Sequence, residues 1–535
     1  MILKVVLASV YLAAVISKTS ALQSRDHLSI PLDGSEISDY ASGGDGQYSR
    51  DELDMIQQGK TQRFQRNFGL VSLLGFGTTM MATWEAVFTS NATAALNGGF
   101  PSLVWGFLFS WIGNLATAAS LAEMASMAPT SGGQYHWVAM LAPEKHRVFL
   151  SWITGWIATI GWSANTGIFF SGSMIQGLLV LNDSTYAYHR WHGTLIMWAA
   201  LGIVILVNTI AARFLPKIEG MILILHTLGF FAILIPMVYL SDHNSASTVF
   251  TDFENSAGWN SNGLAFFVGL ISNTLPFIGY DGPAHMAEEV RNAAINVPYA
   301  MIFTVIVNGT LGFAITIAFA FCATDIQSAL ESPTGYDFMY VFQQATQSNA
   351  GTSVMTAIMI VLMICASIGF LATASRQTFA FARDRGIPGS RWLSTVGTTT
   401  KIPFWSVVFC TFITMLICLI NIFSTVAFNA IVSLTIAGLF ISYLIPVSLM
   451  AFKRATGEPI KWGPWKMGSL GLPVNIVSMI YLIITIVFSF FAPETPVTLA
   501  SMNWSCLVFG GFVIIGLVYW FVTGRKVYTG PIRER

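Results

Sequence analysis

Two carboxylates lie in stretches of the sequence that are otherwise apolar enough to cross a lipid bilayer. One of them, Asp281, lies within 275–284. In that stretch Pro276 and Pro283 each remove a backbone hydrogen-bond donor, and two glycines lower the cost of leaving helical geometry. The other, Glu85, lies near mid-depth of the first apolar stretch. Charge is expensive in a bilayer, and broken backbone persists there only where it faces protein or a water-filled cavity. We therefore expect a buried binding site between two interrupted helices.

The groups around the two breaks favour an amine as the ligand. A half-helix that begins at a break presents unpaired N–H groups that suit a carboxylate, and one that ends there presents carbonyls that suit an ammonium. Trp84 and Tyr280 add ring faces for a cation, and Phe277 could gate the pocket. The candidate substrate-binding residues are Thr83, Trp84, Glu85, Phe277, Ile278, Gly279, Tyr280 and Asp281. The pattern favours a cationic or zwitterionic amine.

These residues also have structural alternatives. Asp281 is placed to cap the half-helix that Pro283 begins, and Glu85 could face a buried water or a neighbouring hydroxyl. Trp84 and Phe277 could be ordinary packing residues, because aromatic residues make up 13% of the chain. Substrate contact and structural roles therefore both stay open from the residues alone.

The elements that must position these groups are membrane-spanning helices. Hydrophobic residues make up 54% of the 535 positions and charged residues only 10%, against roughly 25% charged residues in a soluble domain. Twelve apolar stretches are long enough for a span of about 20 residues: 68–90, 101–127, 148–180, 193–212, 218–240, 264–286, 299–322, 353–382, 404–420, 426–451, 473–492 and 504–523. We therefore predict an all-α polytopic membrane protein whose twelve transmembrane helices form one domain, residues 67–524.

The basic residues predict how these helices are oriented. Apart from four in the N-terminal region, 21 of the 26 lysines and arginines fall on one side of the twelve spans, and Arg190 alone falls on the other. Because basic residues gather on the cytosolic side, both termini are expected in the cytosol. Residues 1–66 are predicted to be an N-terminal extension and disordered cytosolic tail, and 525–535 a cytosolic C-terminal tail. Residues 1–22 resemble a secretory signal, and a cleaved signal, an uninserted extension and a mispredicted start all stay open.

Four motifs resemble those of the amino acid–polyamine–organocation (APC) superfamily. The second span ends with Glu123, Pro129 and the turn 132–135, which reads Gly-Gly-Gln-Tyr. The other three motifs lie at 277–280, 287–298 and 375–388. The resemblance covers roughly residues 60–525, and in detail it is most similar to the fungal amino acid, 4-aminobutyrate (GABA) and choline permeases.

This resemblance implies a LeuT-type fold, in which two inverted five-helix repeats (5+5) with broken helices 1 and 6 are joined by two extra helices. It also implies alternating access, with the substrate bound between the two broken helices. Relatives often have Gly-x-Gly at the first break, where this chain has Thr83, Trp84 and Glu85.

A histidine is the candidate for coupling transport to protons. In proton-coupled bacterial relatives a lysine occupies what looks like the position of His226. A histidine titrates near neutral pH, so it can take up and release a proton there. The alternatives are a structural role for His226 and His285 as the proton carrier.

These observations predict a secondary active transporter of amino acids or related amines such as GABA and choline, coupled to protons. A non-transporting nutrient sensor of the same fold and a polyamine transporter are the alternatives. An enzyme is disfavoured because the sequence has no metal-ligand cluster, no Gly-x-Ser-x-Gly and no nucleotide-binding loop. The expected partners are the small-molecule substrate, a proton and the lipid bilayer, with no cofactor, metal or nucleic acid. The expected location is the plasma membrane, with the vacuolar membrane as the alternative.

Overall fold

The computed structural model describes residues 49–163, 166–423, 426–499 and 501–534. Within these residues the chain forms helices and two isolated bridges but no strand. Eleven helices of this described part are long and apolar enough to cross a membrane: Leu70–Ser90, Gly99–Met127, Glu144–Asn182, Arg190–Thr209, Ala212–Leu240, Ala293–Cys322, Asn349–Arg383, Phe404–Ile422, Val432–Thr456, Gly468–Phe488 and Ser505–Val527. The prediction of an all-α polytopic membrane protein is therefore confirmed. Each of these helices overlaps one predicted span, whereas the exact count of twelve and the inverted repeat stay predictions.

The sixth predicted span falls on a shorter apolar helix. It consists of α14 (Asn262–Thr274) and the 3-10 turn η2 (Leu275–Phe277), and the short helices α15 (Gly282–His285) and η3 (Ala287–Glu289) follow it. Between η2 and α15 the backbone is extended at Ile278, and Gly279 adopts a φ of 112°. Only glycine reaches that conformation at low cost. The prolines and glycines of this stretch thus interrupt the helix as predicted.

The first spanning helix is interrupted as well. Helix α4 (Leu70–Met81) ends where Ala82 adopts the left-handed conformation, with φ of 44° and ψ of 46°, and α5 (Thr83–Ser90) begins at the next residue. This conformation costs an alanine about 1 kcal/mol, so the surrounding packing must hold it. The short helix α6 (Ala92–Leu96) continues α5. The break lies immediately before the three residues for which the sequence predicted it.

The broken helices occupy the centre of the bundle. In the most apolar stretch of the first spanning helix, 78% of the residues are buried. In that of the last spanning helix, which includes α24 (Ser505–Tyr519), only 11% are buried. Helices α12 (Leu215–Leu240), α16 (Ala293–Cys322) and α19 (Asn349–Arg383) pack against α4, and α7 (Gly99–Met127) packs against α14 and α16. The other long helices are α9 (Glu144–Ser163), α10 (Thr166–Asn182), α11 (Arg190–Thr209), α21 (Phe404–Phe423), α22 (Val426–Thr456) and α23 (Gly471–Phe488). The outer helices expose apolar side chains, which suit lipid.

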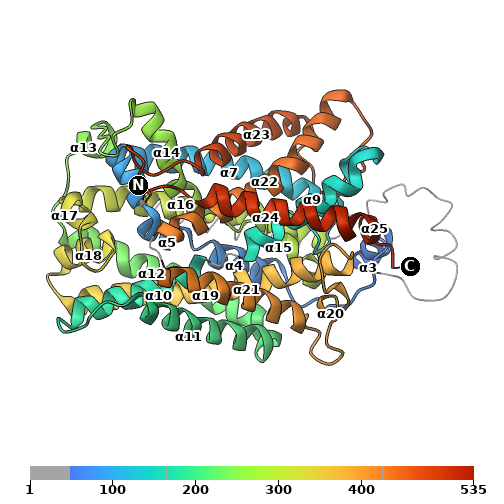
Figure 1. The fold of residues 1–535 in the computed structure, drawn as a ribbon, viewed down its shortest axis with the longest axis horizontal. Helices are drawn as coiled ribbons and strands as arrows, with labels where there is room; N and C mark the ends of the chain where they lie inside the picture. Colours follow the sequence, from blue (N-terminus) through green and yellow to red (C-terminus); the bar gives the residue numbers. More distant parts are fainter. Residues whose placement is uncertain (1–48, 164–165, 424–425, 500, 535) are drawn as a thin grey trace.

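The bundle has two distinct ends, and Figure 1 shows different short helices at each. One end carries α3 (Arg50–Gln57), α20 (Ser390–Leu393) and α25 (Arg525–Val527). We call it the basic face, because Lys60, Arg63, Arg376 and Arg383 form ion pairs there. The other end, the opposite face, carries α13 (Ala246–Phe250), α17 (Ile326–Leu330) and α18 (Asp337–Thr346).

Helix α3 corrects one expectation. The stretch 50–57 was placed in the disordered N-terminal tail, but it forms a helix that starts with a capping box. Asp51 in this helix accepts hydrogen bonds from the N–H groups of Asn292 and Ala293, at 2.8 and 3.0 Å. Those groups begin α16, so Asp51 caps α16 and holds α3 against it. The expectations for residues 1–48 lie outside the described residues.

We predict that Asp51→Ala loosens α3 from the bundle. The substitution removes the acceptor for two N–H groups of α16, and the loss of an N-cap acceptor costs about 1 kcal/mol. In purified protein the melting midpoint should fall, and amide hydrogen exchange in α3 should become faster. Asp51→Asn keeps an acceptor oxygen and should stay closer to the wild type. Identical exchange in the wild type and Asp51→Ala would show that another contact holds α3.

Candidate functional site

The two breaks face each other beside a small cavity. Thr83 Oγ1 in α5 donates a hydrogen bond of 2.7 Å to the carbonyl of Pro276 in η2. The cavity has a volume of about 20 Å³ and is lined by Met80, Met81, Ala82, Ala86, Gly167, Phe170, Leu275, Ile278, Met363, Ala366 and Phe370. We call it the central cavity. Its side chains are apolar, and three of them are methionines, which are flexible enough to move aside for a ligand.

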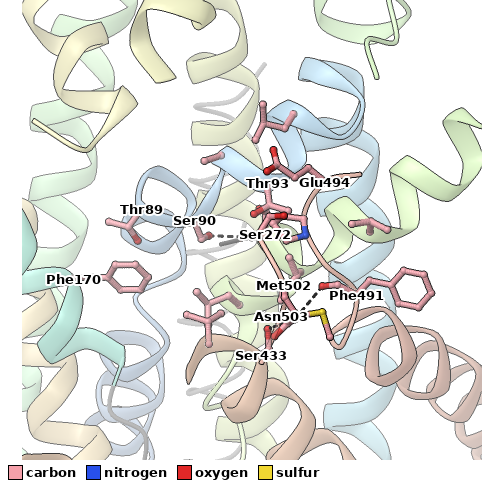
Figure 2. Close-up of a pocket in the computed structure, with 18 residues that line it drawn as sticks. Thr89, Ser90, Thr93, Phe170, Ser272, Ser433, Phe491, Glu494, Met502 and Asn503 are labelled. Carbon is pink, nitrogen blue, oxygen red and sulfur yellow. Dashed lines mark hydrogen bonds between the residues drawn. The ribbon is translucent and has the colours of Figure 1, made fainter. Parts of the chain in front are cut away.

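A larger cavity, about 360 Å³ in volume, lies beside α5, α6 and α14. Figure 2 shows the residues that line it. We call it the outer cavity; its polar lining residues include Thr89, Ser90, Thr93, Ser272, Glu494, Ser501 and Asn503. Asn503 Nδ2 donates to the carbonyls of Ser489 and Phe491, at 2.8 and 3.0 Å, and this ties Asn503 to the end of α23 beside the cavity. Phe170 and Leu275 line both cavities. These two side chains therefore separate the outer cavity from the central one.

A buried carboxylate and a histidine meet beside the first break. Glu85 Oε1 in α5 lies 2.7 Å from His226 Nδ1 in α12, and both side chains are excluded from solvent. Glu85 Oε2 and His226 Nε2 have no hydrogen-bond partner among the described residues. The ring of Trp84 lies 5.7 Å from the His226 ring and 6.1 Å from that of Phe230, between centroids. The Glu85–His226 pair links α5 to α12, and each of its two side chains keeps one polar atom without a hydrogen-bond partner among the described residues.

The second carboxylate, Asp281, has more partners. Its Oδ2 accepts a hydrogen bond of 2.6 Å from Gln134 Nε2 in α8 (Gln134–Leu141), and its Oδ1 accepts one of 2.6 Å from the hydroxyl of Tyr443 in α22. His285 Nε2 lies 3.3 Å from Oδ2, and the other ring nitrogen lies 3.0 Å from the carbonyl of Ser131. Asp281 stands at the N-cap position of α15, but its side chain does not cap that helix. It joins the sixth helix to α8 and α22 instead.

Ion pairs close the bundle at the basic face. Arg383 at the end of α19 donates two hydrogen bonds to Glu288 in η3, at 3.0 and 2.8 Å, and Arg376 donates to Glu289 at 2.8 Å. Burial would raise the pKa of the Glu288 carboxyl, but Arg383 and a hydrogen bond from the Ser131 N–H hold that pKa below its usual value. Glu288 is therefore ionised, and the pair fixes α19 to the second half of the sixth helix.

The segment after α25 is part of the same closure. The Ile532 N–H donates to Asp384 Oδ1 at 3.0 Å, and the Ile532 carbonyl accepts from Lys60 Nζ at 2.9 Å. Lys60 and Asp384 also form a buried ion pair with each other. Glu534 pairs with Arg63 at 2.6 Å. The bundle is therefore closed at the basic face, while its larger cavity lies on the side of the opposite face.

The structure brings the eight predicted substrate-binding residues together at the two breaks but gives them different surroundings. Ile278 lines the central cavity. Thr83 joins the breaks, and Phe277 packs against Phe107 with ring centroids 4.9 Å apart. Tyr280 packs against Tyr443 at 5.6 Å, and Gly279 provides the turn beside it. Trp84 and Glu85 face α12, and Asp281 faces α8 and α22, so the contact of these three residues with a substrate stays a prediction.

Sequence reasoning missed most of the cavity lining. Met80 and Met81 precede the first break directly, and this adjacency was the available signal for them. Phe170 in α10 and Phe370 in α19 come from helices without a distinctive motif. Their positions depend on how distant helices pack, and the periodicity of an apolar helix carries no such information.

Comparison with known proteins decides the family. A model of the amino acid permease family matches residues 68–512. The chain belongs to this family. The permease is 31% identical over 442 residues to a putative amino acid/polyamine transporter of Macrophomina phaseolina, covering 81% of this chain and 96% of that protein. It is 30% identical over 470 residues to a choline transporter of Saccharomyces cerevisiae (87% and 82%), and 26% identical over 479 residues to amino-acid permease 2 of Neurospora crassa (89% and 88%). The resemblance to the APC superfamily is confirmed, and the protein is a transporter, not an enzyme.

We predict that Glu288 and Arg383 stabilise the permease as a pair. Glu288→Gln leaves a buried guanidinium without its counter-ion, and the loss of one partner of a buried pair costs about 3–5 kcal/mol. The double variant Glu288→Gln with Arg383→Gln should therefore melt at a higher temperature than Glu288→Gln alone. Differential scanning fluorimetry in detergent measures both midpoints.

A matched exposed pair serves as the control for this prediction. Lys453 and Glu458 lie 2.8 Å apart, and Glu458 is 45% exposed. Such pairs contribute about 0–1 kcal/mol, so Glu458→Gln should shift the midpoint little. Additive effects of Glu288→Gln and Arg383→Gln would contradict the proposed pairing.

Proposed function

We propose that this permease is a secondary active transporter that moves an amino acid or a related amine, such as GABA or choline, together with a proton by alternating access. The observation that carries the proposal is the buried contact between Glu85 and His226 beside the first break. Ionisable groups inside a membrane bundle often mark ion and proton pathways. Histidine is the side chain that changes charge most readily near neutral pH.

A proton on this pair would change how α5 is held against α12. With a neutral His226 the contact is a hydrogen bond to Glu85, and with a protonated His226 it becomes an ion pair in a low-dielectric site. The stronger contact favours the conformation in which α5 lies against α12. By linkage, that conformation binds the proton more tightly. Because Ala82, the residue immediately before α5, lines the central cavity, proton binding and substrate binding act on the same half-helix.

The central cavity supports a small amine as the substrate. The rings of Phe170 and Phe370 line it, and aromatic rings attract ammonium groups. The last carbonyls of α4 point to the break at Ala82, and carbonyl ends of helices suit a positive charge. Two relatives are named a choline transporter and an amino-acid permease, and a third a putative amino acid/polyamine transporter. We therefore place choline, GABA, neutral amino acids and polyamines in the substrate test.

The proposal includes an orientation and a location. Residues 67–524 form the transport domain, which lies in the lipid bilayer of the plasma membrane, with the vacuolar membrane as the alternative. The basic face lies in the cytosol, because lysines and arginines gather on that side of membrane proteins. The outer cavity then faces away from the cytosol, and the substrate enters past Phe170 and Leu275.

The first test is uptake by proteoliposomes that contain the purified permease and carry an imposed pH gradient, acidic outside. Labelled choline, GABA, a neutral amino acid and spermidine are compared. We expect one of them to accumulate, and a protonophore to abolish its accumulation. Glu85→Gln and His226→Gln should each reduce gradient-driven accumulation by at least about tenfold, since positioned proton-transfer groups contribute 10²-fold or more.

His146→Gln provides the matched control, because His146 is an exposed histidine at the start of α9. It should accumulate substrate like the wild type. Accumulation that persists without a pH gradient would contradict proton coupling. Specific binding of a substrate without any accumulation would favour the nutrient sensor over the transporter.

A further inference from the structure

A further buried carboxylate, Glu219, lies on α12, outside the contacts described so far. Glu219 is fully buried, and its Oε2 accepts a hydrogen bond of 2.6 Å from Thr79 Oγ1 in α4. Its Oε1 has no hydrogen-bond partner among the described residues. A carboxylate that is buried without a cation is least costly when it carries a proton. Glu219 therefore has the chemistry of a group that exchanges a proton when its surroundings change.

Glu219 and His226 lie on the same face of α12. Seven residues make two helical turns, which is about 10 Å along the axis. Glu219 contacts Thr79 before the first break, and His226 contacts Glu85 after it. A Cβ added at Gly75 would lie 3.1 Å from the Glu219 carbonyl oxygen, so α4 and α12 approach each other closely at this level. The first broken helix and α12 thus enclose both titratable groups in one interface.

The helices around Glu219 bring no counter-ion to it. Helices α4 and α16 contain no charged residue. From α19, Cys365 lies within electrostatic range of both Glu219 and Glu85. The other charged groups on elements packed against α12 are Arg213, Lys217, Asp337, Arg376 and Arg383. Arg213 and Lys217 are exposed, Asp337 begins α18 at the opposite face, and Arg376 and Arg383 are paired with Glu289 and Glu288.

The position of Glu219 along α12 places it between the Glu85–His226 pair and the basic face. Glu219 lies one turn from the start of the helix, where Lys217 is exposed at the basic face, and His226 lies near the middle. A proton that leaves the Glu85–His226 pair toward the basic face therefore passes Glu219. The hydrogen bond from Thr79 belongs to α4, the half-helix that must move if the basic face opens.

We propose that Glu219 receives the proton that the Glu85–His226 pair releases and delivers it to the basic face. This inference rests on the proposed proton-coupled transport. In the step, the N–H bond of protonated His226 breaks, its electron pair stays on the nitrogen, and the proton, carried by water that enters the interface, forms an O–H bond on the ionised carboxylate of Glu219. When α4 moves away, water reaches the carboxyl group and takes the proton. Glu219 is then an ionised acceptor again, ready for the next cycle.

The test separates net transport from exchange. Net gradient-driven uptake requires a proton to leave at the basic face in every cycle, whereas counterflow of labelled against unlabelled substrate does not. Glu219→Gln should therefore lower net uptake by about tenfold or more, and counterflow should stay within about twofold of the wild type. Glu219→Asp keeps a carboxyl group and should recover part of the net uptake. Glu331→Gln, at an exposed carboxylate that follows α17, is the matched control and should leave both rates unchanged.

The outcomes of this test distinguish failure of the proposed function from failure of the role proposed for Glu219. If the wild type shows no proton coupling, the proposed function itself fails. If the wild type is coupled and Glu219→Gln retains its net uptake, only the role of Glu219 is overturned. Equal loss of net uptake and counterflow in Glu219→Gln would show a structural role instead. Should Glu219→Gln be unstable in detergent, Thr79→Val replaces it in the same two assays, because this substitution removes the hydroxyl and leaves the carboxylate. If Thr79→Val changes net uptake and counterflow by the same factor, the proposal is overturned.

Discussion

The hydrocarbon core of a membrane offers no hydrogen-bond partners, so two interrupted helices can exist there only inside a shell of other helices. That requirement explains the arrangement of the permease. Helices α7, α12, α16 and α19 surround the breaks, and α24 and the other peripheral helices expose apolar side chains. The Thr83 hydroxyl at the first break also donates a hydrogen bond to the Pro276 carbonyl at the second, so a side chain of one break pairs a backbone acceptor of the other. The bundle is therefore organised by the polar backbone at its centre as much as by the apolar surface around it.

The two central carboxylates differ in how many partners they have. Asp281 accepts hydrogen bonds from Gln134 in α8 and Tyr443 in α22 and lies close to His285, so two other helices fix its position. Glu85 has a single partner, His226, and each of the two side chains keeps one polar atom without a partner among the described residues. A saturated group resists change, whereas a group with spare capacity can gain or lose a proton within its site. This difference in local satisfaction supports our proposal that the first break carries the coupling and that Asp281 positions the sixth helix.

Features that depend on nearby residues were predictable from the sequence, and those that depend on tertiary packing were not. Pro276, Pro283 and Gly279 interrupt a helix through their own backbone chemistry, so the break at 275–284 could be read directly. Glu85 and His226 were each singled out, but their contact joins residues 141 positions apart and no local pattern encodes it. Phe170 lines the central cavity, and no local pattern predicted this position either. Helix α3 was missed because two helical turns give too little periodicity, and its stability comes from the contact of Asp51 with α16.

The contact of residues 532–534 with Lys60 and Arg63 also has a consequence for biosynthesis. The chain is made from its N-terminus, and the twelve predicted spans precede these residues in the sequence. Lys60 and Asp384 are therefore made before Ile532, whose backbone N–H and carbonyl complete their ion pair. A nascent permease can therefore assemble its bundle in the membrane while the basic face is still incomplete. Residues 532–534 can complete the closure at that face only after they have left the ribosome, whereas the ion pairs of Arg376 and Arg383 do not depend on them.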